Sequence, residues 1–172
     1  GRVRGGELDP ELVDLARLNL RLAGLDAPVH HGDVFAAPPP PADVVVANPP
    51  YSVEIDDPTV LARFELGRGR RRVPSDVLFV EALESLVRPG GRAAVVLPWS
   101  LVANPTWATV RARLDAHWVR TAVCELPEGV FRPFGGAAGK ACLLWMQRRP
   151  APTRPCRAAR LDDPGYDPRS KF

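Results

Sequence analysis

The sequence predicts an α/β fold with a mostly parallel sheet and one antiparallel strand at an edge. Short apolar runs alternate with segments in which apolar residues recur every three or four positions, the patterns of strands and helices. Such alternation is typical of a parallel sheet with helices on its faces. The last two apolar runs, residues 119–127 and 140–148, have no helical segment between them. We therefore expect them to form a hairpin, which places an antiparallel strand at one edge.

Six strands and three helices are expected along the chain. The strands are residues 2–7, 27–33, 44–47, 92–98, 119–127 and 140–148. The helices are residues 9–24, 75–87 and 105–116. Between them we expect a proline-rich loop at 36–43, an irregular arm at 52–74, and loops at Pro98 and at 128–139.

Each element rests on a local pattern. The first helix, closed by Gly24, carries apolar residues three and four positions apart, and the helix at 75–87 has the same spacing before "RPGG" stops it. Residues 44–47 are β-branched in part and too short for a helix, and the prolines after them cannot donate to a sheet ladder. They predict a buried strand that ends at Asn48. We expect residues 1–149 to form a partial catalytic domain, and the polar, proline-rich residues 150–172 to be a loosely held tail or the start of a following region.

Composition is that of a globular chain and excludes several classes. The chain has 172 residues with 45% hydrophobic and 25% charged, which fits one domain with a hydrophobic core. No run of 18 apolar residues and no signal-peptide pattern occurs, so we expect a cytoplasmic protein without a membrane segment. Its three cysteines show no metal-binding or disulfide spacing, so we expect no metal, and Cys124 and Cys142 are expected to be small core residues.

Acidic residues end the first two strands. Glu7 is placed where a carboxylate commonly accepts hydrogen bonds from both hydroxyls of an adenosine ribose. Asp33 could accept from an adenine amine, with Leu8 and Phe35 offering apolar contacts to the base. The alternatives are a helix-capping or surface carboxylate at Glu7 and a Gly-Asp turn at Asp33. With Asn48 at the third strand end, the tips should converge on one crevice, which favours a nucleoside pocket.

The tetrapeptide Asn48, Pro49, Pro50, Tyr51 is suited to activating a planar amine. Such an amine is a poor nucleophile because its lone pair is delocalised into the ring, and fixed acceptors on both N–H groups make it more pyramidal. The Asn48 side-chain oxygen and the Pro49 carbonyl can be those acceptors, and the prolines stiffen the segment. Tyr51 can stack on the base, which in DNA must first rotate out of the duplex. The alternative is a bare turn with an exposed tyrosine.

The chain is basic, and one segment concentrates arginines. The net charge of +3 and pI near 9.1 permit a nucleic-acid partner without requiring one, and GC-rich coding alone could explain the arginine content. "GRGRRR" at residues 67–72 packs four arginines together, which suits phosphate contact because guanidinium groups match phosphate oxygens. A solvated loop is the alternative.

Three short motifs carry a resemblance to a known family. "GELDP", "GDVF" and "NPPY", in this order, resemble those of S-adenosylmethionine-dependent amino methyltransferases. "LVRPGGRAAVVLP" and "LPEGVFRPFGGAAGKACLLWMQR" are similar to the later part of N6-adenine DNA methylases, in particular the modification subunits of type I restriction systems. The resemblance covers residues 6–148 and implies a Rossmann-like methyltransferase fold, S-adenosylmethionine as cofactor and DNA as substrate. It also implies a specificity subunit and a restriction subunit as partners.

The resemblance also implies roles for individual residues. The expected cofactor-binding residues are Glu7, Leu8, Asp33, Val34 and Phe35. The expected catalytic residues are Asn48, Pro49, Pro50 and Tyr51. The expected substrate-binding residues are Phe131, with Phe134 as its nearby substitute, and, from their clustered charge and not from the resemblance, Arg70, Arg71 and Arg72. Phe131 would stack against the flipped base, with burial in the core as its alternative.

Departures from the family pattern matter as well. The family's first strand and its Gly-rich loop should precede Gly1, and "FGGAAGKA" does not replace that loop because it precedes a strand instead of following one. A target-recognition domain and the helical amino-terminal region are not recognisable either. We therefore expect a fragment of a longer protein, one that alone is poorly stable and inactive because the missing strand would sit centrally in the sheet.

Other functions share the tetrapeptide. Glutamine N5-methyltransferases of release factors and some RNA methyltransferases resemble it, and a decayed methylase that only binds nucleic acid or a subunit is a further alternative. The segment around Phe131 and the basic arm favour DNA. The expected reaction is direct in-line methyl transfer without a metal or a covalent intermediate. No cysteine lies in the inferred pocket, which argues against the thiolate route to carbon-5 of cytosine.

Overall fold

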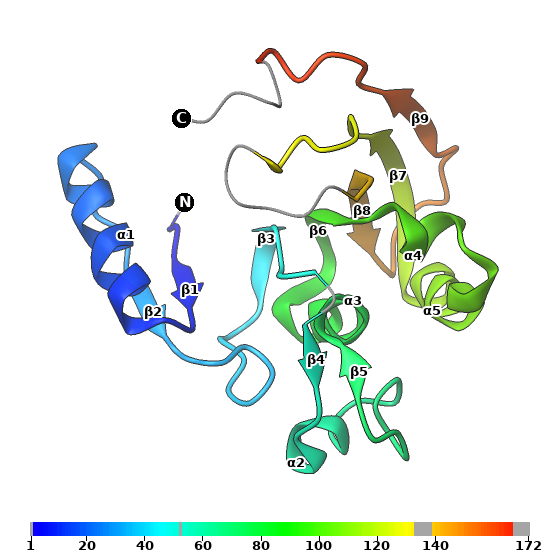
Figure 1. Cartoon of the computed structure of the whole chain (residues 1–172), viewed down its shortest axis with the longest axis horizontal. Coiled ribbons are helices and arrows are strands. Elements are labelled where there is room, and N and C mark those ends of the chain that lie inside the picture. The colour runs from blue at the N-terminus through cyan, green and yellow to red at the C-terminus, as the bar shows by residue number, and fades with distance from the viewer. Residues whose placement is uncertain (1, 52, 133–138, 167–172) are drawn as a thin grey trace. The chain divides into compact units, whose positions relative to one another are not determined.

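The structure is a computed structural model that describes residues 2–51, 53–132 and 139–166. Two compact units make up the chain, Gly1–Pro40 and Pro41–Phe172, and each is described by itself. Figure 1 labels their helices and strands.

The first unit is a small βαβ element. Strands β1 (Gly5–Glu7) and β2 (Val29–His31) pair in parallel, and helix α1 (Pro10–Leu22) connects them. The helix begins where Asp9 accepts hydrogen bonds from the first-turn N–H groups and Pro10 presets the backbone. It ends before Gly24, whose φ of +69° suits a residue without a side chain. The predicted helix and both strands are confirmed, although β2 ends at His31 and not near Asp33.

The apolar face of α1 lies largely open within this unit. A two-stranded sheet is too narrow to cover a helix of 13 residues, and among the described residues of this unit the buried apolar side chains are Val13, Val29 and Phe35. Each of the following side chains is about half exposed or more: Leu12, Leu15, Leu18 and Leu22.

The second unit is built on a mixed five-stranded sheet in the order β3-β6-β8-β7-β9. Its strands are β3 (Ala42–Ala47), β6 (Val87–Pro98), β7 (Trp118–Glu125), β8 (Ala141–Arg148) and β9 (Arg157–Arg160). β3 and β6 are parallel, β8 runs antiparallel to both β6 and β7, and β9 is parallel to β7. The predicted α/β class and the β7–β8 hairpin are confirmed.

Helices α3 (Ser75–Leu86) and α5 (Ala108–His117) cover one face of this sheet (Figure 1). α3 contacts β6, α5 contacts β7, and the two helices contact each other. Alternate residues of the paired strands point into this layer, as in the pair Val95 and Leu144, which is fully buried. The core of the second unit therefore lies between this helix pair and the sheet.

Three predictions about the sheet are wrong. The antiparallel strand is not at an edge, because β8 lies between β6 and β7 and the expected loose tail supplies β9 as the outer strand. β3 is not buried: Val44 and Val46 are 58% and 79% exposed, since β3 is itself an edge strand. "RPGG" does not separate α3 from a strand at Arg92, because β6 already begins at Val87.

A side chain at Gly91 would lie 2.8 Å from the Asp43 carbonyl oxygen, so the glycine lets β6 pass close to β3.

Short elements replace two predicted loops. The arm after the tetrapeptide contains β4 (Glu54–Ile55), α2 (Pro58–Leu61) and β5 (Val73–Pro74), with β4 and β5 paired antiparallel. After β6, α4 (Trp99–Ala103) follows at once, and the predicted helix at 105–116 is a 3₁₀ turn, η1 (Pro105–Trp107), followed by α5. Within the described residues, no helix is both long enough and apolar enough to span a bilayer.

Candidate active site

The tetrapeptide lies at the carboxyl end of β3, as predicted. Ala47 is the last residue of the strand and pairs with Val95 of the parallel strand β6. Asn48 therefore projects from the sheet edge at which ligands bind in open α/β folds. The Asn48 side chain is exposed, whereas Pro49 is buried and anchors the segment.

Tyr51 orients the amide of Asn48. Its hydroxyl donates a hydrogen bond of 3.0 Å to Oδ1 of Asn48. A carbonyl-type oxygen has two lone pairs, so Oδ1 can still accept a second hydrogen bond from a ligand amine. Burial raises the pKa of Tyr51, and the nearby Cys142 and Asp76 raise it further, so the hydroxyl stays protonated as a donor.

Phe131 joins Tyr51 from a distant part of the sequence. The ring centroids are 6.3 Å apart and the planes meet at 72°, an edge-to-face contact. Phe131 is half-buried and not part of the core, so its predicted alternative of core burial does not apply. Phe134, the predicted substitute, lies outside the described residues. The structure thus brings together an amide acceptor and two aromatic rings.

Ser75 supports the tetrapeptide from α3. Its hydroxyl donates to the carbonyl oxygen of Pro50 at 2.9 Å, and its backbone N–H donates to the carbonyl oxygen of Val53 at 2.8 Å. Sequence reasoning missed this residue, because nothing in the local pattern links it to a carbonyl 25 positions earlier.

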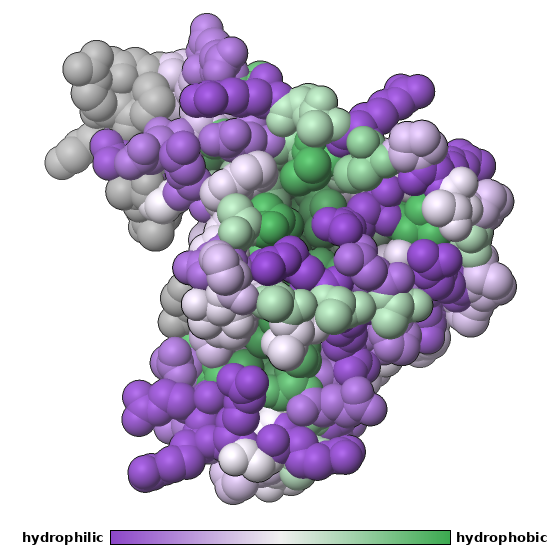
Figure 2. All heavy atoms as spheres, turned by 90° about the vertical axis from the view of Figure 1, so that its right-hand side faces the viewer, coloured by the Kyte–Doolittle hydropathy of each residue, from purple (hydrophilic) through white to green (hydrophobic). Residues whose placement is uncertain are grey.

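The predicted arginines Arg70, Arg71 and Arg72 are exposed on the loop before β5. Figure 2 shows hydrophilic side chains gathered at its lower end, over the segment with α2 and this loop. The loop packs closely on itself: Gly67 approaches the backbone of Leu61 so closely that a Cβ would lie 2.6 Å from the Leu61 carbonyl oxygen, and the N–H of Arg70 donates to the Gly67 carbonyl. The arginines are therefore presented by a tight turn.

A buried carboxylate anchors the start of this loop. Glu81, only 8% exposed, accepts the backbone N–H groups of Glu65 and Leu66 through its two oxygens, at 2.8 and 2.9 Å. Arg113 of α5 lies 3.2 Å from Glu81 and 2.6 Å from both Glu65 and Glu84. The hydrogen bond from Arg113 is the main cause that lowers the pKa of Glu65. Sequence reasoning also missed this network, since its members lie up to 48 positions apart.

The predicted cofactor residues belong to the first unit. Glu7 ends β1 opposite His31, and the N–H of Gly32 donates to the carbonyl oxygen of Glu7. The turn that leads to Asp33 therefore lies beside Glu7, at the carboxyl ends of β1 and β2. Oε1 of Glu7 accepts the N–H groups of Leu8 and Asp9, at 2.6 and 3.0 Å, which lie before the helix; the helix cap is Asp9 and not Glu7. A carboxylate has further acceptor capacity on its second oxygen. The convergence of this edge with Asn48 stays a prediction.

The groups around this edge fit a nucleoside in part. Oδ1 of Asp33 accepts the N–H of Phe35 at 2.8 Å, which is the turn geometry that was the alternative for this residue. Leu8 is 63% exposed and Val34 is partly exposed, so both can contact a base, whereas Phe35 is only 8% exposed and serves the core of this unit. The carboxylate acceptors of Glu7 and Asp33 and the apolar side chain of Leu8 are the kinds of group that the ribose hydroxyls and the adenine of S-adenosylmethionine require. The structure does not give Phe35 a role in contacting the base.

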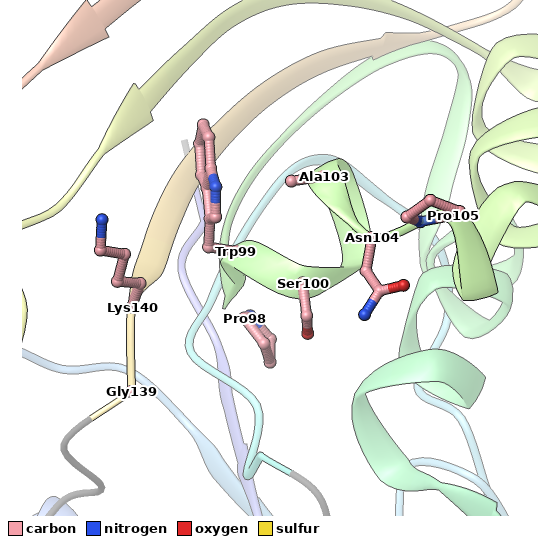
Figure 3. A pocket seen from close by; sticks show the side chains of 8 residues that line it. All are labelled: Pro98, Trp99, Ser100, Ala103, Asn104, Pro105, Gly139 and Lys140. Atoms are coloured by element: carbon pink, nitrogen blue, oxygen red, sulfur yellow. The ribbon is translucent and has the colours of Figure 1, made fainter.

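A hollow of about 590 Å³ lies beyond the carboxyl end of β6 and does not include the tetrapeptide. Figure 3 shows that its polar side chains diverge: Trp99 and Lys140 point to one side, and Ser100 and Asn104 to the other. Such a set offers no common point for a ligand, so we assign no site here. Nor do the described residues contain a cluster of three or more His, Cys, Asp or Glu side chains that could hold a metal ion.

Comparisons with known proteins concern the family and the fold of the chain. The sequence model of a family described as N-6 DNA Methylase matches residues 2–155. A solved structure described as a class I S-adenosylmethionine-dependent methyltransferase from Listeria monocytogenes superposes with a TM-score of 0.82 at 21% identity, over 96% of this chain and 51% of that one. A modification subunit of a type I restriction enzyme from Vibrio vulnificus gives 0.71 at 28% identity, over 87% and 33%. The M protein of the type I restriction enzyme EcoKI gives 0.70 at 22% identity, over 98% and 37%.

The solved structures show the fold of the chain, and the sequence model shows its family. The Listeria and EcoKI structures share the fold, and the chain spans between about a third and a half of the length of the three proteins. The chain has the Rossmann-like fold of S-adenosylmethionine-dependent methyltransferases, as predicted. Because the family match extends over most of its length, the chain belongs to the N-6 DNA Methylase family.

Proposed function

We propose that the protein carrying this chain transfers a methyl group from S-adenosylmethionine to the N6 amine of adenine in DNA. The observation that carries the proposal is the grouping of the Asn48 amide with the rings of Tyr51 and Phe131 at the carboxyl end of β3. An amide oxygen beside two rings is suited to a planar base that bears an amine. A glutamine side chain has no ring face for such a pair to hold.

Each residue has a chemical part in this reaction. Oδ1 of Asn48, oriented by Tyr51, and the carbonyl of Pro49 accept the two N–H groups of the amine and make its nitrogen more nucleophilic. Because the two ring planes meet at 72°, one ring can stack on the face of a base that has rotated out of the duplex while the other meets its edge, and together they exclude water around it. When bound, S-adenosylmethionine supplies an electrophilic methyl group for direct in-line transfer. The surplus proton then leaves the amine to solvent.

The surroundings of the site support DNA as substrate. The exposed arginines Arg70, Arg71 and Arg72 follow a tight turn and can contact DNA phosphates. We further propose Glu7, Leu8 and Asp33 as the nucleoside-binding groups of the cofactor site. By analogy with type I systems, a specificity subunit and a restriction subunit are the proposed partners, in the cytoplasm.

The test uses the full-length protein that carries this chain. Calorimetry with S-adenosylmethionine separates a methyltransferase from a module that only binds nucleic acid or a subunit, since the latter gives no cofactor heat. Radiolabel transfer to DNA, RNA and a release factor then ranks the substrates. We expect label on the adenine N6 of DNA, and label on the release factor or on RNA alone would reject the DNA assignment.

A variant pair tests the acceptor role. Asn48→Ala removes the amide acceptor, and loss of one such preorganised group typically lowers kcat about 100-fold or more. Asn104→Ala is the matched control, because the Asn104 amide oxygen likewise accepts a hydrogen bond, at 2.9 Å from the N–H of Thr106, but outside the tetrapeptide. Normal methyl transfer by Asn48→Ala would show that the amide is not an acceptor in the reaction.

A further inference from the structure

Ser75 makes two hydrogen bonds to the segment that contains the tetrapeptide. It is the first residue of α3 and is 1% exposed. Its hydroxyl holds the Pro50 carbonyl at 2.9 Å and its N–H holds the Val53 carbonyl at 2.8 Å. Tyr51 lies between these two attachment points. The same residue therefore fixes the chain on both sides of the aromatic side chain.

The hydroxyl does not serve its own helix. Serine near a helix start commonly accepts a hydrogen bond from the N–H groups of the first turn. Here the N-cap residue of α3 is Pro74, which makes no side-chain hydrogen bond, and the first-turn N–H of Val77 donates to Oδ1 of Asp76 at 3.0 Å and not to Ser75. The hydroxyl acts instead as a donor, directed at a carbonyl 25 residues earlier. A purely helix-stabilising role does not explain this direction.

The tetrapeptide can make few backbone hydrogen bonds of its own. Pro49 and Pro50 have no N–H, so two successive residues cannot anchor the segment by donating backbone hydrogen bonds. The carbonyl of Pro50 follows directly on that of Pro49, the proposed second acceptor for the amine. A rotation of the Pro50 peptide would therefore displace Tyr51 and, with it, the hydrogen bond that orients Asn48.

We propose that Ser75 is a positioning residue for methyl transfer, which holds the tetrapeptide in the geometry that activates the amine. This inference rests on the proposed function and deepens it. Ser75 touches neither substrate nor cofactor in this role and acts through Pro50 and Tyr51. Its loss should therefore lower kcat and leave the binding of S-adenosylmethionine nearly unchanged.

The experiment compares two serines of one helix in the full-length protein. Ser75→Ala removes the hydroxyl and keeps the backbone N–H bond to Val53. Ser85→Ala is the control, because the Ser85 hydroxyl also donates to a backbone carbonyl, that of Ala82 at 2.8 Å, within α3. Ser75→Cys, which is close in size and a weak donor, repeats the measurement if the alanine variant does not fold.

Two readouts are measured on each variant. Displacing a reacting group by about 1 Å can cost on the order of 100-fold in rate, so we expect Ser75→Ala to lower kcat about tenfold or more, with the KM for S-adenosylmethionine within about twofold of the parent. Hydrogen exchange of the peptide 48–56 should become faster in Ser75→Ala and stay unchanged in Ser85→Ala.

The outcomes separate this inference from the proposed function. Normal kcat in Ser75→Ala, or equal losses in both serine variants, would overturn the positioning role. Unchanged exchange of the peptide 48–56 would overturn it as well. If the parent methylates none of DNA, RNA and a release factor, the proposed function fails, and the exchange measurement alone then decides whether Ser75 holds the segment.

Discussion

The hydroxyl of Tyr51 gives the sharpest test of the site. Tyr51→Phe removes the 3.0 Å hydrogen bond to Oδ1 of Asn48 and keeps the ring that faces Phe131. A hydrogen bond of this kind contributes about 0.5–1.5 kcal/mol net. If that amount is lost from the transition state, kcat should fall about twofold to tenfold. Tyr51→Ala, which also removes the stacking surface, should lose considerably more.

The assay is steady-state transfer of labelled methyl groups to DNA, over a range of pH. Because burial raises the pKa of Tyr51 above its usual value of 10.0, the hydroxyl stays a donor up to that pH and should cause no loss of kcat below it. The neutral hydroxyl is favoured in the folded state, so its contribution to stability is present below pH 10 and is lost as the pH rises further. Equal kcat for the parent and Tyr51→Phe would refute the orienting role, and equal losses for the phenylalanine and alanine variants would show that the ring adds nothing.

Two further predictions concern the loop and its anchor. Replacing Arg113 by methionine leaves two largely buried carboxylates of α3 without their cation and should lower the free energy of unfolding in urea by about 2–4 kcal/mol. Arg88→Met breaks only an exposed pair and should change it by about 0.5 kcal/mol or less, so equal losses would contradict the burial argument. Replacing Arg70, Arg71 and Arg72 by glutamine should make the plot of log affinity for DNA against log salt shallower by up to about 3, and an unchanged slope would show that this loop touches no phosphate.

Elements with local signals were predictable from the sequence. The bounds of α1 follow from residues within it or beside it, Asp9, Pro10 and Gly24, and these side chains act on their own turn. The end of β3 is set by Pro49 and Pro50 in the same way, because neither can continue a ladder. The placement of Asn48 at the sheet edge follows from this, and it was therefore within reach of the sequence alone.

Features that depend on distant partners were not predictable. The exposure of Val46 depends on which strands flank β3, and β9 forms by backbone pairing alone, with all four of its residues exposed and no apolar pattern to announce it. The contacts of Ser75 and Arg113 join parts of the chain 25 and 48 residues apart. Such pairs have no periodicity, so only the folded chain shows them.

Helix α3 holds two separate segments of the proposed site. Its first residue, Ser75, binds the carbonyl of Pro50 in the tetrapeptide. Glu81, six positions further and about 9 Å along the helix axis, binds the start of the loop that carries the arginines. Because the helix is almost wholly buried, a substitution that tilts it will shift both attachments at once. The affinity for nucleic acid and kcat should therefore change together among variants of the α3 core. Substitutions of Arg70, Arg71 and Arg72 should change the affinity alone. Attempts to tune the affinity for nucleic acid without loss of rate are therefore best confined to these arginines.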